Sequence, residues 1–335
     1  LDLQAVPVMT RGSPSAGGSL LLALLALFSW GGDADRSEHN LEHFGQYHRA
    51  RDVLLDYGDG TEVLTYDDLA FGYETMINDP RNGFEDSFKF FGISSQQDPM
   101  DVIILQELFA DLRPDLVVEL GTFCGGGALL FAHMLTLLGV QGAKVLTIDP
   151  YDQRKNRASP CFESSPNFDA AHGYNHPLWD VYVERGTIVK VLVPALGDAQ
   201  KYDEAAREVS KIVARYASKA KTVFVSEDSA HEKSMVLRNA KILAPFVSVG
   251  SYLLVQDTRL DRDCEMGNRT KVPNYEDYTR PKKPFCKWYI HNGPAAAVAE
   301  LFRDDATFRD HFIVDRKPEK YILTQHPGGW LKRIS

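Results

Sequence analysis

Four acidic residues stand where carboxylates commonly do chemistry, because each one ends or directly follows a short apolar run of the sequence. They are Glu119, Asp149, Asp228 and Asp257. If the runs before Asp228 and Asp257 are neighbouring strands, their tips come within reach of one ion. Oxygen ligands suit Mg²⁺ or Ca²⁺, so we predict a divalent-cation site, with the amide oxygen of Gln256 as a weaker third ligand. The alternative is that both acids only cap helices.

His231 follows Asp228 by three residues and is expected at the mouth of the same site. An imidazole with an ordinary pKa of about 6.5 suits a general base that accepts a proton from a substrate hydroxyl. We therefore assign catalytic roles to His231 and Asp228. A purely structural histidine is the alternative.

The segment GTFCGGG, residues 121–127, follows the apolar run LVVEL. Glycines after a first strand let the backbone approach a nucleotide-like ligand closely. The dinucleotide fingerprint GxGxxG is absent, because Phe123 stands where its second glycine belongs. The spacing Glu119-x-Gly121-x-x-x-Gly125 fits a loop that holds the amino-acid part of S-adenosylmethionine, and an ordinary helix start is the alternative.

Asp149 ends the second predicted strand, where a carboxylate accepts hydrogen bonds from ribose hydroxyls. Asp152 is the second choice for that role, and a helix cap is the alternative for Asp149. Gly197 and Asp198 follow the third predicted strand, and such a pair often lies beside an adenine. An ordinary turn explains this pair almost as well.

These residues need a scaffold, and the hydrophobic pattern predicts one. Apolar runs predict strands over residues 116–120, 144–149, 188–193, 222–226, 252–255, 312–314 and 321–324. Helical spacing predicts helices over residues 101–112, 128–139, 203–217, 232–243 and 294–302. Alternation of strands and helices indicates an α/β fold with a mostly parallel sheet and helices on both faces. Ligands of such sheets bind beyond the carboxyl ends of the strands.

The composition limits the function. The chain has 335 residues, a formal net charge of −9, 44% hydrophobic and 25% charged residues, which excludes a disordered or fibrous protein. The acidic balance argues against a nucleic-acid partner. Four cysteines are too few for a disulfide scaffold, and none forms a CxxC pair of the zinc ribbons. Cys264 and Cys286 flank one loop-like stretch, and they either pair in an oxidising compartment or remain free thiols.

We divide the chain into three parts. Residues 1–35 contain an apolar run, 19–30, which is shorter than the ~20 residues of a membrane span. It is a signal or anchor segment of a secretory or organellar protein, or a structural helix of a cytoplasmic one; only this segment would associate with a membrane. Residues 36–100 form a largely helical extension that ends in a loop. The main domain spans 101–335.

The main domain has a lid insertion over about 258–292. The insertion is locally basic on an acidic protein, so it either meets an anionic substrate or is a solvated loop. Its basic residues are Arg259, Arg262, Arg269, Lys271, Arg280, Lys282, Lys283 and Lys287.

Several motifs in a fixed order resemble the cephalosporin hydroxylase family, which includes rhamnosyl O-methyltransferases. They are RPDLVVELGTFCGGGALLFAHML, VLTIDPY, VFVSEDSAHE, APFVSVGSYLLVQDT and GGWLKR, and the resemblance runs from about Phe90 to the C-terminus. It implies a Rossmann-like class I methyltransferase fold with a seven-stranded sheet. It also implies S-adenosylmethionine and Mg²⁺, or another divalent cation, as cofactors.

The resemblance assigns roles residue by residue. The cofactor loop falls on Glu119, Gly121, Thr122 and Gly125, the metal acid on Asp228 and the following histidine on His231. The family's Glu-Asp metal pair falls on Gln256 and Asp257. The missing carboxylate lowers the affinity for the metal or changes the metal.

The main functional hypothesis is therefore an O-methyltransferase that modifies a hydroxyl of a sugar or natural-product small molecule. A cofactor-binding accessory subunit of an oxygenase system is the alternative, which the change to Gln256 slightly favours. A nicotinamide-dependent oxidoreductase fits less well, because the second glycine of GxGxxG is missing. We expect a small hydroxylated acceptor as partner, no nucleic acid, and allow a homo-oligomer.

Overall fold

A computed structural model of the chain describes residues 89–153, 177–261, 291–321 and 323–335. It also describes the shorter stretches 52–53, 64–65, 70, 73, 161, 168–169 and 173–174. All of them lie in the compact unit Asn40–Ser335. The apolar segment 1–35, most of the lid insertion, and both Cys264 and Cys286 lie outside the described residues, so the predictions made for them stay predictions.

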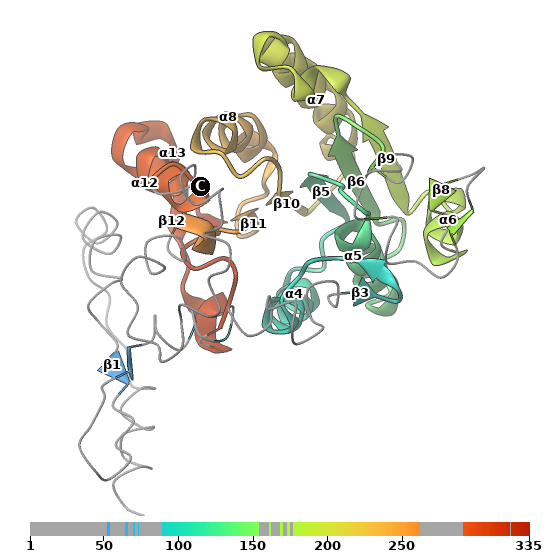
Figure 1. The fold of residues 1–335 in the computed structure, drawn as a ribbon, viewed down its shortest axis with the longest axis horizontal. Coiled ribbons are helices and arrows are strands. Elements are labelled where there is room, and N and C mark those ends of the chain that lie inside the picture. Colours follow the sequence, from blue (N-terminus) through green and yellow to red (C-terminus); the bar gives the residue numbers. More distant parts are fainter. Residues whose placement is uncertain are drawn as a thin grey trace, which may run out of the picture. The chain divides into compact units, whose positions relative to one another are not determined.

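A sheet of seven strands organises the main domain (Figure 1). Its strands lie in the order β12-β13-β11-β10-β5-β6-β9. Their bounds are β5 Leu116–Leu120, β6 Lys144–Asp149, β9 Ile188–Leu192, β10 Val223–Glu227, β11 Tyr252–Val255, β12 Phe312–Val314 and β13 Trp330–Arg333. Strands β9, β6, β5, β10 and β11 pair in parallel, whereas β13 runs antiparallel to both of its neighbours. The predicted Rossmann-like, mostly parallel sheet is confirmed.

Helices cover both faces of this sheet (Figure 1). One face packs against α4 (Pro99–Leu112), α5 (Gly126–Leu137) and α6 (Pro177–Glu184). The other packs against α7 (Tyr202–Ala217), α8 (Lys233–Leu243), α12 (Pro294–Asp304) and α13 (Ala306–His311). Because both faces are covered, β5, β10 and β11 are buried along their whole length. This explains why their sequences are nearly continuous apolar runs rather than alternating ones.

Short elements connect these strands and helices. Single 3-10 turns span Pro194–Gly197, Ala199–Lys201, Ala244–Phe246 and Lys317–Tyr321, and a two-stranded pair joins β7 (Phe168–Asp169) to β8 (Gly173–Tyr174). The stretch before α4, predicted as a loop, contains a hairpin of β3 (Lys89–Phe90) and β4 (Ile93–Ser94). Phe91 and Gly92 turn it with positive φ angles of 48° and 93°. The hairpin is therefore closed by a turn of left-handed residues that matches strand twist.

The predicted helical extension is described in only a few places. There, β1 (Asp52–Val53) pairs antiparallel with β2 (Leu64–Thr65), while Ala70 and Tyr73 are helical. The strands mark two sites where the extension is not helical. Within the described part of the chain, no helix is both long and apolar enough to cross a bilayer.

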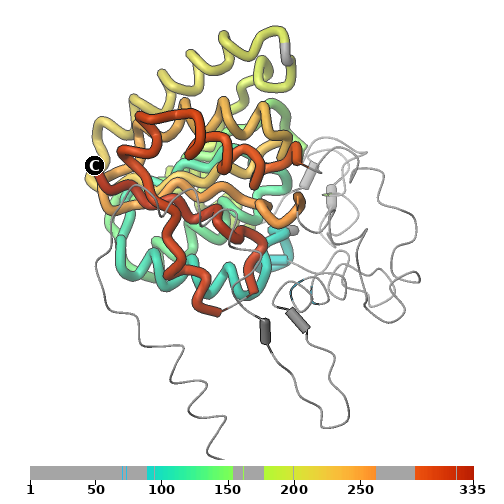
Figure 2. Tube along the Cα trace, turned by 90° about the vertical axis from the view of Figure 1, so that its left-hand side faces the viewer, coloured from blue at the N-terminus to red at the C-terminus, as the bar shows by residue number. Residues whose placement is uncertain are grey.

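The predicted last strand, over residues 321–324, is wrong. Tyr321 ends a 3-10 turn, and the last strand is β13, which pairs with β11. Figure 2 draws this C-terminal segment in red. The segment after the turn is used differently, because the Thr324 hydroxyl and the Gln325 N–H both donate to the carboxylate of Asp101 on α4. These bonds hold the backbone of residues 324–325 against the start of α4. Trp330, the first residue of β13, is fully buried in the core.

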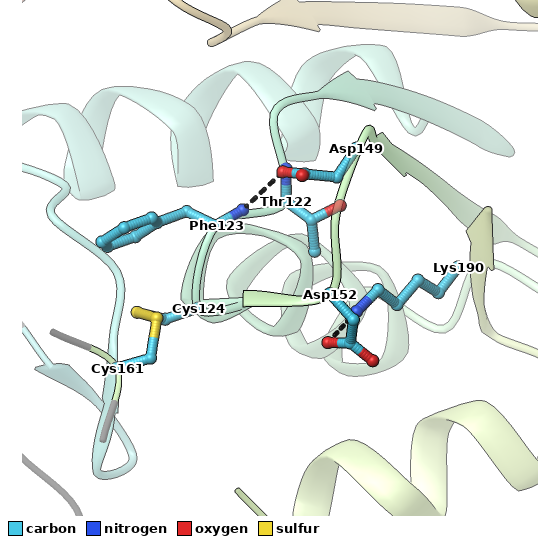
Figure 3. Close-up of a disulfide and its surroundings, with 7 residues drawn as sticks. All are labelled: Thr122, Phe123, Cys124, Asp149, Asp152, Cys161 and Lys190. Carbon is cyan, nitrogen blue, oxygen red and sulfur yellow. Dashed lines mark hydrogen bonds and ion pairs between the residues drawn. A yellow bond between two sulfur atoms is a disulfide. The ribbon is translucent and has the colours of Figure 1, made fainter. Parts of the chain in front are cut away.

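A disulfide joins Cys124 to Cys161, with a Cα–Cα distance of 5.3 Å (Figure 3). From the sequence alone, only Cys264 and Cys286 are candidates for a pair. The spacing of the four cysteines does not indicate that Cys124 pairs with Cys161. Cys124 lies in the glycine-rich turn between β5 and α5, directly before the N-cap residue Gly125. The disulfide therefore ties that turn to a part of the chain that follows β6.

We predict that replacing both Cys124 and Cys161 by serine destabilises the fold. The bridge spans 37 residues of sequence, and the loop-entropy relation for that length gives a loss of about 4 kcal/mol in the free energy of unfolding. Urea unfolding followed by circular dichroism measures it. Reductant should lower the unfolding midpoint of the wild type more than that of the double variant. An equal midpoint for oxidised and reduced wild type would contradict the prediction.

Candidate functional site

The carboxyl ends of β5, β10 and β11 lie side by side at one edge of the sheet. The ladder continues past the strand ends, where Asp228 N–H donates to the Leu120 carbonyl at 2.8 Å and Gln256 N–H to the Glu227 carbonyl at 2.9 Å. The acids that follow these strands are thereby held at neighbouring positions. This is the arrangement that parallel strands impose on the residues directly after them.

Three side chains meet at this edge. Asp228, His231 and Asp257 each offer one ligand atom, and these atoms all lie within 4.8 Å of one another. The His231 Nε2 atom lies 3.3 Å from the Asp257 Oδ2 atom. Two carboxylates and an imidazole form a donor set that fits a divalent cation. The structure thus brings together both predicted metal acids and places the predicted base among them.

The backbone is unusual at two of these residues. His231 and Asp257 have positive φ angles of 57° and 54°. A residue with a Cβ atom in the left-handed region costs about 1–3 kcal/mol and persists only when its surroundings hold it there. Such conformations cluster at functional sites. Both residues aim their side chains toward the same point from turns that follow different strands.

Negative charge accumulates around Asp228. Withdrawal from water, together with the neighbouring carboxylates of Asp257, Glu119 and Glu227, raises the pKa of Asp228 well above its ordinary value. Each of these neighbours disfavours the charged form of Asp228. A bound cation reverses that balance, because it favours ionised carboxylates. The accumulated negative charge and the oxygen and nitrogen ligand atoms at this edge therefore both favour a bound cation.

Gln256 is directed into the protein. Its Nε2 atom donates to the Ser226 hydroxyl at 2.7 Å, and its Oε1 atom accepts from Gln97 Nε2 at 2.6 Å. The side chain is buried. The structure therefore gives the Gln256 amide two protein partners, and its role as a weak third metal ligand stays a prediction.

The glycine-rich turn lies next to the acidic cluster. Gly121 has a φ of 105°, and a Cβ atom there would overlap the carbonyl oxygen of Asp228. Gly125 has a φ of 91°, and a Cβ atom there would overlap the ring of Trp179. Both positions therefore require glycine, for conformation and for space. Thr122, between them, shares a hydrogen bond of 2.6 Å with the Thr147 hydroxyl.

Glu119 lies beneath this turn with 2% of its surface exposed. Its carboxylate accepts a hydrogen bond from the Thr147 hydroxyl at 2.5 Å. Burial, assisted by the charge of Asp149, raises the pKa of Glu119 to about 8 even though the Thr147 bond lowers it. Glu119 is therefore mostly protonated at neutral pH.

Asp149 holds two loops together (Figure 3). Its Oδ2 atom accepts from the backbone N–H groups of Thr122 and Phe123 at 2.9 and 3.1 Å. Its Oδ1 atom accepts from Tyr151 N–H at 2.9 Å. Asp152, the second choice for the ribose, pairs with Lys190 Nζ at 2.5 Å. Each carboxylate oxygen can accept more than one bond, so a ribose role for Asp149 stays a prediction.

Gly197 and Asp198 lie after β9, on the same side of the sheet as Tyr151. A Cβ atom on Gly197 would overlap the Tyr151 hydroxyl, so ring and backbone are in close contact. The Asp198 carboxylate accepts from Gln200 N–H at 2.9 Å and caps the short turn that follows. The capping contact agrees with the ordinary-turn alternative, and a place beside an adenine stays a prediction.

The sequence itself was compared with known families. A profile described as Rhamnosyl O-methyltransferase/CmcI matches residues 82–168 and 202–334. The chain belongs to this family. The predicted family resemblance is therefore confirmed.

Individual relatives agree with this assignment. Rhamnosyl O-methyltransferases of Mycobacterium tuberculosis and Mycobacterium leprae are 28% and 27% identical to the chain over 172 residues. Each match covers 51% of this chain, and it covers 57% and 61% of the two relatives, so the chain spans less than two thirds of their length. Two structures of CmcI are also similar. An apo form has a TM-score of 0.42 and 15% sequence identity, and the match covers 75% of this chain and 77% of that one. A form with Mg and SAM has a TM-score of 0.40 and 15% sequence identity, and the match covers 86% of this chain and 87% of that one.

The matched ranges of the Rhamnosyl O-methyltransferase/CmcI family include the glycine-rich turn, Asp149, the metal-ligand candidates and the C-terminal segment. They leave out residues 169–201, which contain Gly197 and Asp198. Sequence reasoning did not single out Gln97, Tyr151, Trp179 or His326, which contact the predicted site residues. Of these four, only Tyr151 could have been predicted from the sequence, because it lies two residues after Asp149, the acid that ends β6.

We predict that Glu119 makes the fold less stable as pH rises. Between its ordinary pKa of 4.5 and its raised pKa of about 8, the folded protein holds a proton that the unfolded chain has released. The free energy of unfolding therefore falls across this window, by up to about 1.4 kcal/mol per pH unit for one proton. Glu119→Gln should flatten the dependence by that amount in urea unfolding from pH 5 to 8, whereas exposed Glu184→Gln should not. An unaltered slope in Glu119→Gln would count against the assignment.

Proposed function

We propose that the protein is an S-adenosylmethionine-dependent, divalent-metal-assisted O-methyltransferase acting on a hydroxyl of a sugar or another natural-product small molecule. The cluster of Asp228, His231 and Asp257, whose ligand atoms lie within 4.8 Å of one another, carries this proposal. It lies beside a glycine-rich turn in a chain of the Rhamnosyl O-methyltransferase/CmcI family. Family membership supplies the class of reaction, and the cluster supplies groups able to carry it out.

The turn after β5 would hold the amino-acid part of the cofactor. Gly121, Thr122 and Gly125 bring the backbone close to a ligand, and the first turn of α5 presents N–H groups that suit a carboxylate. Glu119 lies under the turn, where an ammonium group would favour its ionised form. Asp149 is proposed to bind the ribose while it keeps the turn in place. Gly197 and Asp198 are proposed to lie beside the adenine.

Asp228 and Asp257 would hold the divalent cation, with Gln256 as a weak further ligand. When bound, S-adenosylmethionine supplies the methyl group, and Mg²⁺ lowers the pKa of the acceptor hydroxyl. The residues of the centre would hold the acceptor oxygen in line with the methyl group. Such positioning by itself gives large rate gains. His231 accepts the hydroxyl proton, and the Asp257 carboxylate 3.3 Å from its Nε2 atom favours the imidazolium that results.

The alternative proposal is a cofactor-binding accessory subunit of an oxygenase system. The position of Gln256 is the observation that favours it. The amide that replaces a family carboxylate is bonded to Gln97 and Ser226. A subunit that only binds the cofactor needs fewer charged ligands at this edge. Methyl transfer by the isolated protein distinguishes the two functions.

The compartment and the assembly are also proposals. The Cys124–Cys161 disulfide supports an oxidising compartment, because such bonds persist there and are rare in the cytosol. This favours the secretory or organellar alternative over the cytoplasmic one. A homo-oligomer, and a membrane association through the N-terminal segment, remain open proposals.

We predict that Asp228→Asn separates the two ligands. Calorimetry should show S-adenosylmethionine binding within about 3-fold of wild type, and Mg²⁺ binding weakened by at least about 10-fold because one anionic ligand is lost. Methyl transfer from labelled cofactor to a panel of hydroxylated sugars should fall about 100-fold or more. Exposed Asp203→Asn serves as the matched control and should behave like wild type.

Three outcomes separate the proposals. Wild type that binds no S-adenosylmethionine, with or without Mg²⁺, would remove both of them. Cofactor binding with transfer that depends on Asp228 supports the methyltransferase. Cofactor binding without transfer to any acceptor, and with activity only after a partner protein is added, supports the accessory subunit instead.

A further inference from the structure

A strap of six residues, 324–329, lies along the turn that carries Asp257. We define it as the C-terminal strap, between the 3-10 turn Lys317–Tyr321 and β13. It follows the turn for its whole length, and hydrogen bonds join the two segments on either side of Asp257, among them one from the Arg259 guanidinium to the Thr324 carbonyl (3.1 Å) and three others. The three others run from Val255 N–H to the Gly329 carbonyl (2.9 Å), from the Thr258 hydroxyl to the Pro327 carbonyl (2.9 Å) and from Arg259 N–H to the Gln325 carbonyl (3.2 Å).

His326 lies at the middle of the strap and is fully buried. Its Nδ1 atom accepts a hydrogen bond from the backbone N–H of Asp257 at 2.9 Å. A backbone N–H only donates, so this ring nitrogen carries no proton. The proton of the neutral ring is therefore on Nε2.

The Nε2 atom of His326 lies 3.6 Å from the Asp101 Oδ2 atom. Asp101 is itself fully buried, on α4, and accepts hydrogen bonds from the Thr324 hydroxyl and from Gln325 N–H. The same carboxylate thus faces the ring and holds the strap on which the ring is mounted. A carboxylate on this side favours the tautomer with the proton on Nε2.

Asp257 depends on such support. Its φ of 54° is left-handed, a conformation that its Cβ atom makes unfavourable and that surrounding contacts must hold. The N–H group is fixed by His326 on one side, while the carboxylate on the other side lies 3.3 Å from His231. Loss of the acceptor would leave this N–H without its protein partner and would favour rearrangement of the turn.

We propose that His326 is a positioning residue of the candidate metal centre, which holds the Asp257 carboxylate toward Asp228 and His231 by accepting the Asp257 N–H. This inference rests on the part of the proposed function that places a divalent cation at this centre, and it does not depend on methyl transfer. His326 has no direct role in the chemistry. Asp101 holds the strap through Thr324 and Gln325, so the support reaches from α4 through the strap to Asp257.

The test compares substitutions that differ in the position of an acceptor. His326→Asn keeps an oxygen at the place of Nδ1, His326→Leu removes the acceptor at similar size, and Thr258→Val removes a strap bond that does not involve Asp257. Mg²⁺ binding is measured by calorimetry on the full chain, with S-adenosylmethionine binding and thermal unfolding measured in parallel. We expect His326→Leu to weaken Mg²⁺ binding at least about 10-fold, as for other residues that orient metal ligands. His326→Asn and Thr258→Val should remain within about 3-fold of wild type, and cofactor binding should be unchanged in all of them.

If His326→Leu does not fold, His326→Gln replaces it, because its amide oxygen reaches the place of Nε2 rather than that of Nδ1. Mg²⁺ binding that is strong in His326→Asn and weak in His326→Gln or His326→Leu supports the inference. Equal Mg²⁺ binding in wild type and all variants overturns it and leaves the proposed function standing. Equal losses in His326→Asn and His326→Leu overturn it as well. Wild type that binds cofactor but no Mg²⁺ overturns the metal centre and this inference together.

Discussion

Repulsion among carboxylates at one edge of the sheet is the constraint on which the rest of the site depends. A parallel sheet places the carboxyl ends of neighbouring strands side by side, and here those ends carry Glu119, Glu227, Asp228 and Asp257. Each acid is accommodated differently. Glu119 stays mostly protonated, since burial raises its pKa to about 8. Glu227 accepts hydrogen bonds from Ser229 and Asn239. Asp228 and Asp257 face His231, and a cation would relieve the repulsion that remains.

The surrounding elements hold this edge in shape. Asp149 bonds the backbone of the glycine-rich turn to the end of β6, and the Cys124 disulfide ties the same turn to a later part of the chain. On the other side of the edge, the C-terminal strap holds the turn of Asp257. The cofactor side and the metal side are thus fixed by separate contacts. A change in one therefore need not disturb the other.

The strands and the acids could be predicted because their signals are local. LVVEL and YLLV are short runs rich in apolar residues, which are typical of strands buried on both faces. The contacts that complete the site join residues far apart in sequence, and no local pattern encodes them. His326 reaches Asp257 across 69 residues, Gln97 reaches Gln256 across 159, and Thr324 reaches Asp101 across 223. The predicted strand over 321–324 was wrong for this reason, because a long-range bond overrides its β-like composition.

The presence of an amide rather than a carboxylate at position 256 has a physical explanation in these contacts. The Gln256 amide donates to Ser226 and accepts from Gln97, and an ionised carboxylate could only accept. A glutamate here would also add a carboxylate beside Glu227 and Asp257, where negative charge already raises the pKa of Asp228. With the amide in place, the donor set of the edge is two carboxylates and the imidazole of His231. Such a set is less negative than one of three carboxylates. The Gln256 amide therefore joins the sheet edge to Gln97 and Ser226 without adding negative charge to it.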